Sequence, residues 1–239
     1  MWYIASKLFH EVRKMLITKG SWFAKEIIIQ SIYMKLRFTL SYRDVEELLK
    51  DRGISVDHAT IQRWVVKFTP YLEKKFFNKK RKVCKSWRMD ETSMKIKGKW
   101  YWYYRAVDKE GDIIDFFLSE RRNTTAAKRF LIKAINRNGK PIKINIDKSG
   151  ANTAGIKRYK KQYNRRIEIR QCKYLNNIVE QSHRFIKKKV RPMLGFKSFE
   201  SAGVTLAGFE VVRMLQKRQQ RYAKNSSKSV PEMFRLLAA

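Results

Sequence analysis

Three carboxylates in the second half of the chain occupy positions from which they could bind metal ions. Asp90 lies within an extended segment in an apolar setting, Asp147 ends a short apolar run, and Glu180 lies in a later segment of helical periodicity. Acids are scarce, with 21 Asp and Glu against 55 Lys and Arg, so their positions carry information. Carboxylate oxygens suit Mg²⁺, which keeps waters and accepts phosphate oxygens as its remaining ligands.

The chemistry predicted from these acids is phosphoryl transfer. Two metal ions about 3.5–4 Å apart would stabilise the attacking and leaving oxygens of an in-line displacement at phosphorus. We therefore predict that Asp90, Asp147 and Glu180 hold two Mg²⁺ ions, for which Mn²⁺ can substitute. Each acid alone could equally be solvated or paired with a cation, so the prediction depends on the three together. The competing acids are predicted to be turn or surface residues: Glu91, Asp108, Asp112, Asp115 and Glu120.

The charge of the chain indicates a polyanionic partner. The formal net charge is +34 over 239 residues, far more than solubility needs, and nucleic acid is the partner that such an excess favours. A hydrophobic content of 44% excludes a disordered basic tail. No apolar run is long enough for a membrane span and no signal-peptide core is present, so we expect a cytoplasmic, nucleoid-associated protein with no membrane partner.

Residues 21–68 predict three helices arranged as a helix-turn-helix. Ser41 can begin the second helix through a capping box with Asp44, and Asp57 can cap the third after a turn at Gly53. Gln and Arg side chains on the outward face of a third helix can contact base edges in DNA. The predicted DNA-binding residues are Thr60, Gln62, Arg63 and Lys67, although a helical hairpin with a solvated polar face would show the same pattern.

A basic run at residues 73–85 separates this helical region from a region of extended pattern. It is predicted to be a linker that contacts phosphates, or one that is merely solvated. Beyond it we expect a meander of three antiparallel strands and a fourth strand that returns parallel beside the first. The expected elements are strands at 86–96, 100–107, 113–118, 142–146 and 167–170, and helices at about 123–136, 151–162, 176–190 and 199–220.

Two orientations inside this region bear on function. Trp100 to Tyr104 is interpreted as sheet core in preference to a base-stacking surface, because alternation in a strand explains it without a ligand. In the helix near 176–190, Glu180, His183 and Lys187 are expected to share one stripe that faces the site. The apolar side chains of Ile178, Phe185 and Ile186 are expected to pack on the sheet.

Several motifs, all in one order, resemble those of a known family. They lie at residues 40–49, 56–61, 87–92, 102–108, 126–131, 146–148, 173–180 and 194–199. Together they are similar to the transposases of bacterial insertion sequences of family six, over about residues 21–218.

The resemblance implies a ribonuclease-H-like catalytic domain with a DDE triad, and the triad falls on Asp90, Asp147 and Glu180. It also implies a catalytic role for Lys187, seven positions after the glutamate, at a phosphate near the scissile bond. His183 matches a histidine of the family. The chain departs from the family pattern at Ser182, where relatives often carry Asp.

We therefore predict an α/β protein with a helical helix-turn-helix region over 1–72, the basic linker over 73–85, a ribonuclease-H-like mixed sheet with flanking helices over 86–192 and a helical segment over 193–239. The implied function is a metal-dependent transposase that binds double-stranded DNA at terminal inverted repeats and joins it to target DNA. Paired ends predict a homo-oligomer. A non-catalytic helix-turn-helix regulator and a ribonuclease-H-like nuclease that joins no strands remain open alternatives.

Overall fold

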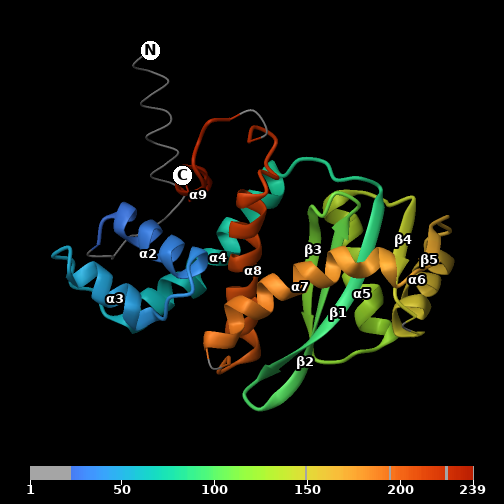
Figure 1. The fold of residues 1–239 in the computed structure, drawn as a ribbon, viewed down its shortest axis with the longest axis horizontal. Helices are drawn as coiled ribbons and strands as arrows, with labels where there is room; N and C mark the ends of the chain where they lie inside the picture. The colour runs from blue at the N-terminus through green and yellow to red at the C-terminus, as the bar shows by residue number, and fades with distance from the viewer. Residues whose placement is uncertain (1–22, 149, 194, 224–225, 239) are drawn as a thin grey trace. The chain divides into compact units, whose positions relative to one another are not determined.

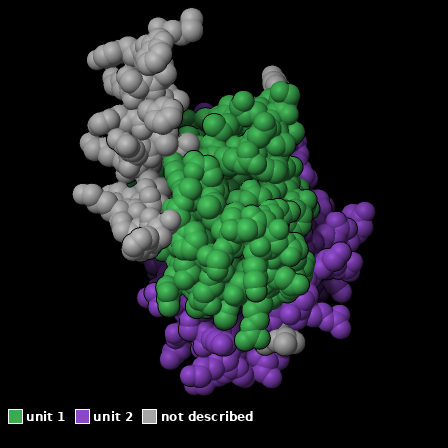
Figure 2. Space-filling view, turned by 90° about the vertical axis from the view of Figure 1, so that its left-hand side faces the viewer, with its two compact units in different colours: residues 1–79, 207–239 green, residues 80–206 purple. Residues whose placement is uncertain are grey.

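The computed structural model describes residues 23–148, 150–193, 195–223 and 226–238. The chain forms two compact units, distinguished by colour in Figure 2. One comprises the described residues up to Lys79 together with those from Ala207 onward, and the other runs from Lys80 to Leu206. Within the described ranges, no helix combines the length and the apolar character that a membrane crossing requires.

The first unit is entirely helical (Figure 1). Its helices are α2 (Lys25–Arg37), α3 (Tyr42–Lys50), α4 (His58–Lys79), the later part of α8 (Phe199–Gln216) and α9 (Val230–Ala238). Buried aliphatic and aromatic side chains from these helices form its core, and Phe23 packs edge-on against Trp64 with ring centroids 5.2 Å apart. The helix α4 continues through the first part of the basic run at 73–85.

Local signals place the helix ends of this unit as predicted. The Ser41 hydroxyl accepts a hydrogen bond from the Asp44 amide at 3.0 Å, and the Asp44 carboxylate accepts one from the Ser41 amide at 2.7 Å, which completes the capping box. Gly53 has a φ of +72°, which a glycine adopts without strain. The Asp57 carboxylate accepts hydrogen bonds from the first amides of α4. The predicted caps at Ser41 and Asp57 and the predicted turn at Gly53 are therefore confirmed.

The second unit contains a five-stranded mixed sheet in the order β3-β2-β1-β4-β5. Its strands are β1 (Ser86–Ile96), β2 (Lys99–Asp108), β3 (Ile113–Ser119), β4 (Lys143–Ile146) and β5 (Glu168–Gln171). The first three pair antiparallel, whereas β4 pairs parallel with both β1 and β5. The predicted meander and the parallel return of the fourth strand beside the first are confirmed, and the sheet agrees with the expected ribonuclease-H-like fold.

Helices cover both faces of this sheet. The helices α5 (Thr124–Asn138) and α6 (Gly150–Gln162) pack on one face over a buried apolar cluster that includes Trp87, Met89 and Phe130. On the other face, α7 (Asn177–Val190) crosses β1 and β2, nearer the viewer in Figure 1. Short 3₁₀ turns lie before and after α7, at Tyr174–Asn176 and Arg191–Met193.

The hairpin between β1 and β2 turns through two residues. Lys97 and Gly98 both have positive φ, +46° and +80°, as a two-residue turn matched to the right-handed strand twist requires. The pairing register places Lys95 opposite Trp100. Since β3 pairs with β2 only from Trp102 onward, the tip of the hairpin extends past β3.

Candidate active site and nucleic-acid interface

Neighbouring parallel strands bring Asp90 and Asp147 to the same level of the sheet. Arg88 of β1 pairs with Asn145 of β4, and each aspartate follows two residues later. Residues two apart on a strand point to the same face, and adjacent strands lie about 4.8 Å apart. Both aspartates are half-buried. The first two predicted metal ligands therefore lie side by side at the carboxyl end of β4, in the middle of the sheet.

Asp90 lies on the face that α7 covers. Its Oδ2 atom is 3.4 Å from Nε2 of His183 on α7, and both side chains are largely buried. The residue paired with Asp90 on β2 is Arg105, whose guanidinium donates a short hydrogen bond to the backbone carbonyl of Ser182. These contacts fix α7 against β1 and β2, directly above Asp90.

The orientation of α7 corrects one prediction. His183 does not share the exposed stripe of Glu180, because it is buried in line with Val179 and Ile186 on the side that packs on the sheet. Their spacing of four and three residues continues one helical face. Glu180 and Lys187 are exposed as expected, and Arg184 occupies the position between them.

The expected docking of Ile178 on the sheet is also wrong. Its side chain remains 36% exposed, near the amino end of α7, whereas Ile186 is fully buried and Phe185 is half-buried. Ile178 lies on the outward side because the buried stripe of α7 begins one residue later, at Val179.

Two asparagines that sequence reasoning missed connect β4 to the start of α7. The Asn145 amide donates to the Cys172 carbonyl at 2.9 Å and to Oδ1 of Asn176 at 2.6 Å. Asn176 is buried immediately before α7, and Glu180 lies in the first turn of that helix. The available sequence signal was Asn145, a polar residue inside the apolar strand β4 on the same face as Asp147.

The donor set of the three predicted ligands fits Mg²⁺, since all of its atoms are carboxylate oxygens. Within the described ranges, two groups of acid, His and Cys side chains have ligand atoms within 4.8 Å of one another: Glu46 with Asp57 and His58, and Cys84 with Asp108 and Glu110. The predicted triad is not one of these groups. Its members come from β1, the end of β4 and the first turn of α7, and Glu180 is exposed.

Glu91 on β1 and Asp115 on β3 are buried within strands, and their prediction as turn or surface residues was wrong. Oε1 of Glu91 is 2.6 Å from Nε of Arg122, and its Oε2 accepts a hydrogen bond from Asn152 at 2.6 Å. Asp115 on β3 is fully buried and lies 3.3 Å from Arg137. Cation pairing allows both acids to remain inside the unit, and a single sequence shows no sign of the distant partners.

The remaining competing acids have structural or surface positions. The Asp108 carboxylate accepts hydrogen bonds from the amides of Glu110 and Asp112, each at 2.9 Å, and so closes the turn between β2 and β3 as predicted. Asp112 lies in the same turn, as predicted, and is buried in an ion pair with Arg81. Glu120 is exposed, as expected.

Arg122 provides a cation beside this site that sequence reasoning did not identify. Burial lowers the pKa of its guanidinium, but the hydrogen bond and charge of Glu91, together with the charge of Asp147, raise that pKa overall. The guanidinium also lies over the ring of Trp102, 5.0 Å from its centroid. Arg122 therefore remains charged between the buried Glu91 and the predicted ligand Asp147.

The helix α4 presents the predicted DNA-binding residues to different degrees. Gln62, Arg63 and Lys67 are exposed, whereas Thr60 is half-buried. Thr60, Arg63 and Lys67 follow one another at spacings of three and four residues, so they share one side of the helix. That side offers hydroxyl, guanidinium and ammonium groups, and the Gln62 amide lies outside it, one residue before Arg63.

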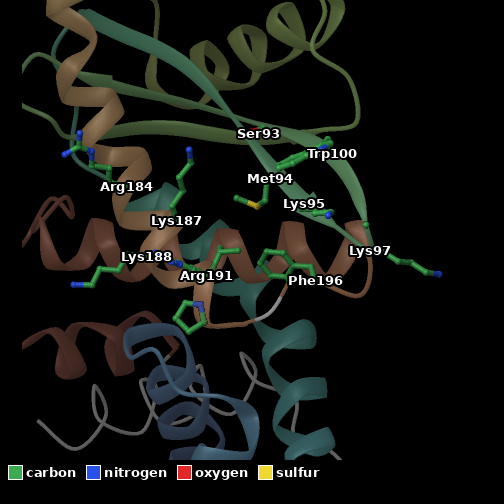
Figure 3. A pocket seen from close by; sticks show the side chains of 14 residues that line it. Ser93, Met94, Lys95, Lys97, Trp100, Arg184, Lys187, Lys188, Arg191 and Phe196 are labelled. Atoms are coloured by element: carbon green, nitrogen blue, oxygen red, sulfur yellow. The ribbon is translucent and has the colours of Figure 1, made fainter.

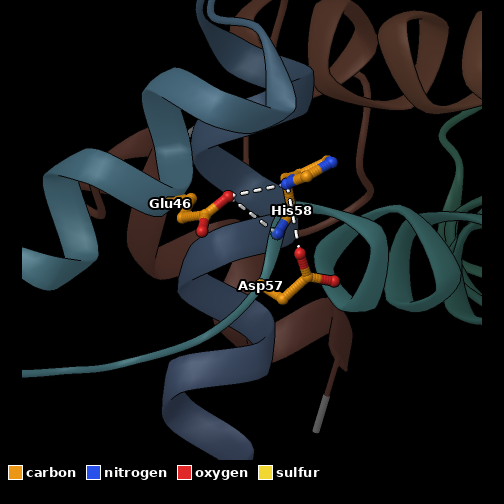
Figure 4. A group of neighbouring side chains, drawn as sticks. All are labelled: Glu46, Asp57 and His58. Atoms are coloured by element: carbon orange, nitrogen blue, oxygen red, sulfur yellow. Dashed lines mark hydrogen bonds and ion pairs between the residues drawn. The ribbon is translucent and has the colours of Figure 1, made fainter.

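A cluster of three side chains joins α3 to the start of α4 (Figure 4). Oε2 of Glu46 accepts a hydrogen bond from the His58 amide at 3.0 Å and lies 2.8 Å from Nδ1 of the same residue. Asp57 Oδ1 lies 3.1 Å from that nitrogen. These contacts hold the start of α4 against α3 through His58.

The aromatic run on β2 divides between core and surface. Tyr103 and Tyr104 are fully buried, as the interpretation of this run as sheet core requires. Trp100 is 62% exposed, so that interpretation is wrong for this residue. Trp100 lies at the hairpin tip, beyond the part of β2 that pairs with β3.

Comparisons with known proteins give concordant results along most of the chain. A family profile described as a DDE domain matches residues 84–219, and one described as transposase IS66 family matches residues 20–140. The transposase for insertion sequence-like element IS431mec of Staphylococcus aureus strain Mu50 is 38% identical over 201 residues, which cover 83% of this chain and 88% of that protein. The Staphylococcus aureus transposase for insertion sequence element IS257 in transposon Tn4003 is 37% identical over the same lengths.

Solved structures also align with part of the chain. The catalytic core domain of HTLV-2 integrase, in a trimeric form in complex with magnesium, aligns with a TM-score of 0.44 at 18% sequence identity. The alignment covers 64% of this chain and 99% of the integrase chain.

Proposed function

This chain belongs to the DDE transposases of insertion sequences, and from that premise we propose that it binds the terminal inverted repeats of a mobile element, cuts one DNA strand there and joins the freed end to target DNA. The observation that carries the proposal is the placement of Asp90 and Asp147 at one level of adjacent parallel strands, under a helix whose first turn holds Glu180.

Asp90, Asp147 and Glu180 are the proposed ligands of two Mg²⁺ ions, which Mn²⁺ can replace. When bound, these ions would activate the attacking oxygen and stabilise the leaving oxygen at phosphorus. His183, 3.4 Å from Asp90, orients that carboxylate toward the ligand position. Lys187 lies two turns after Glu180 on the exposed stripe of α7 and contacts a phosphate next to the scissile bond.

The first unit supplies recognition in this proposal. The exposed side chains of Gln62 and Arg63 on α4 read base edges in the terminal repeat, while Lys67 and Thr60 contact the backbone. The net charge of +34 favours binding to both terminal and target duplexes. Because two ends must be joined to one target, the active species is a homo-oligomer.

A strand-joining assay tests the proposal. Purified full-length protein is incubated with DNA that carries the ends of the element, a target plasmid and Mg²⁺, and the wild type is compared with Asp147→Asn. Glu120→Gln is the matched control, since it neutralises an exposed acid of the same unit. We expect joined products from the wild type and the control and none from Asp147→Asn.

Three outcomes would contradict parts of the proposal. Binding by the wild type without strand chemistry would favour a helix-turn-helix regulator. Cleavage without joining would favour a nuclease. Joined products from Asp147→Asn would remove this residue from the proposed ligands.

A further inference from the structure

A basic hollow of about 1150 Å³ opens between the tip of the β1–β2 hairpin and the carboxyl end of α7 (Figure 3). All of its described lining residues lie in the unit from Lys80 to Leu206, and none of them is acidic. The cations that line it are Lys95, Lys97, Arg184, Lys187, Lys188 and Arg191. The concentration of positive charge indicates an anionic ligand.

The hollow also has an apolar side. Trp100, Met94 and Phe196 line it, and Trp100 is 62% exposed. In Figure 3, Trp100 and Phe196 lie on one side of the hollow and Arg184 lies on the other, along α7. An exposed aromatic face opposite cations is the combination that binds a base together with its phosphates.

Backbone contacts hold this side in place. The Lys97 amide donates to the Phe196 carbonyl at 2.9 Å, and Ile96 forms an isolated parallel bridge with Phe196. The rings of Tyr101 and Phe199 pack 5.2 Å apart. The hairpin tip that carries Trp100 is therefore joined to the segment after α7, and the Lys95 ammonium lies 6.0 Å from the centroid of the Trp100 ring.

We propose that this hollow binds unpaired nucleotides of a DNA strand, with one base stacked on Trp100 and the adjoining phosphates contacted by Arg184 and Arg191. A paired base in the interior of a duplex is already stacked on both sides, so there the indole can stack only on a base that has left the helix. The volume exceeds the roughly 300–1,000 Å³ of pockets for drug-sized ligands, which leaves room for more than one nucleotide.

The inference deepens the proposed function and rests on it for the direction of the strand. Lys187 both lines the hollow and lies on the exposed stripe of α7 that begins at Glu180. A strand held at Trp100 would therefore pass along α7 toward the proposed ligands. The substrate class added here is a DNA end whose strands have separated near the scissile bond.

Binding of short oligonucleotides tests the inference without any strand chemistry. The probe is fluorescein-labelled oligothymidylate of about ten nucleotides, within the site sizes of about 4–16 nucleotides seen for single-strand binders. A blunt duplex of equal length is the second probe, and anisotropy is measured at one fixed salt concentration. The variants of the full chain are Trp100→Ala, Trp100→Phe and the matched control Tyr163→Ala, which removes another exposed ring of the same unit.

We expect Trp100→Ala to weaken oligothymidylate binding about tenfold or more, from the loss of one stacked base. Trp100→Phe should keep most of the affinity, and Tyr163→Ala should change little. Affinity for the blunt duplex should be the same in all four proteins. Because the Trp100 side chain is largely exposed, thermal unfolding should be unchanged in both variants at this position.

The inference would be overturned if Trp100→Ala and Tyr163→Ala lost the same affinity for oligothymidylate. It would also be overturned if Trp100→Ala lost as much affinity for the duplex as for oligothymidylate. The strand-joining assay separates this failure from failure of the proposed function. If Trp100→Ala leaves oligothymidylate binding unchanged while Asp147→Asn abolishes strand joining, the inference alone is overturned. Binding that depends on Trp100, in a protein that never joins strands, would overturn the proposed function alone.

Discussion

Replacing Lys80 with methionine should remove a pH dependence from the stability of the second unit. Lys80 is buried, and its ammonium group donates to the Ile114 carbonyl at 2.6 Å and to the Asn138 side chain at 2.7 Å. Burial lowers the pKa of this lysine from 10.5 to about 7, although the charges of Asp115 and Asp112 act in the opposite direction. Methionine has a similar length and cannot be protonated.

The sign of the effect follows from proton binding in the two states. Between pH 7 and 10.5 the unfolded chain holds a proton on Lys80 that the folded chain has released, so stability rises with pH. The stability that the lowered pKa of Lys80 contributes is fully present above pH 10.5 and is lost as the pH falls toward 7. One unit of pKa corresponds to about 1.4 kcal/mol, so raising the pH from 6 to 9 should add about 2.5 kcal/mol to the wild type relative to Lys80→Met.

Urea unfolding at several pH values, followed by tryptophan fluorescence, measures this difference. Lys82→Met is the matched control, because Lys82 is exposed and is substituted in the same way. Its free energy of unfolding should follow that of the wild type at every pH. Parallel pH profiles for the wild type and Lys80→Met would refute the reasoning, since they would show that Lys80 keeps its ordinary pKa in the folded protein.

Three other predictions concern the helix cap, the buried acid and the recognition helix. Ser41→Ala should lower the free energy of unfolding by about 1 kcal/mol through loss of the capping box, measured by urea unfolding. Glu91→Gln should lower it by about 1–3 kcal/mol, because it removes the charge that pairs with Arg122, and an unchanged midpoint would contradict this. Gln62→Ala should reduce the binding free energy for the terminal repeat by about 1–3 kcal/mol and leave binding to other duplexes unchanged. Lys67→Ala should weaken binding to every duplex and reduce the slope of affinity against salt concentration by about one. Competition binding measures both effects.

Local signals were sufficient to predict most elements of the fold. The capping box at Ser41 and the turn at Gly53 depend on residues within a few positions, and the structure has both. The strand pattern after residue 85 depends on alternation, which also acts over short distances. The predicted ligands were identified by their positions within a strand, at a strand end and on a helix, together with the family resemblance.

The errors concern partners that lie far away in the sequence. The burial of Glu91 depends on Arg122, 31 residues later, and the burial of His183 depends on which face of α7 meets the sheet. Trp100 has the alternation of a core strand, but it lies at the hairpin tip, beyond the part of β2 that pairs with β3. Periodicity predicts which residues share a face and leaves open what that face will meet.

The hydrogen bond from Arg105 to α7 affects which substitutions position 182 tolerates. The guanidinium binds the main-chain carbonyl of Ser182, a group that every residue type at that position provides. A change from Asp to Ser there leaves the attachment of the helix to the sheet intact. Position 182 can therefore vary among copies of the element without releasing the helix that carries Glu180.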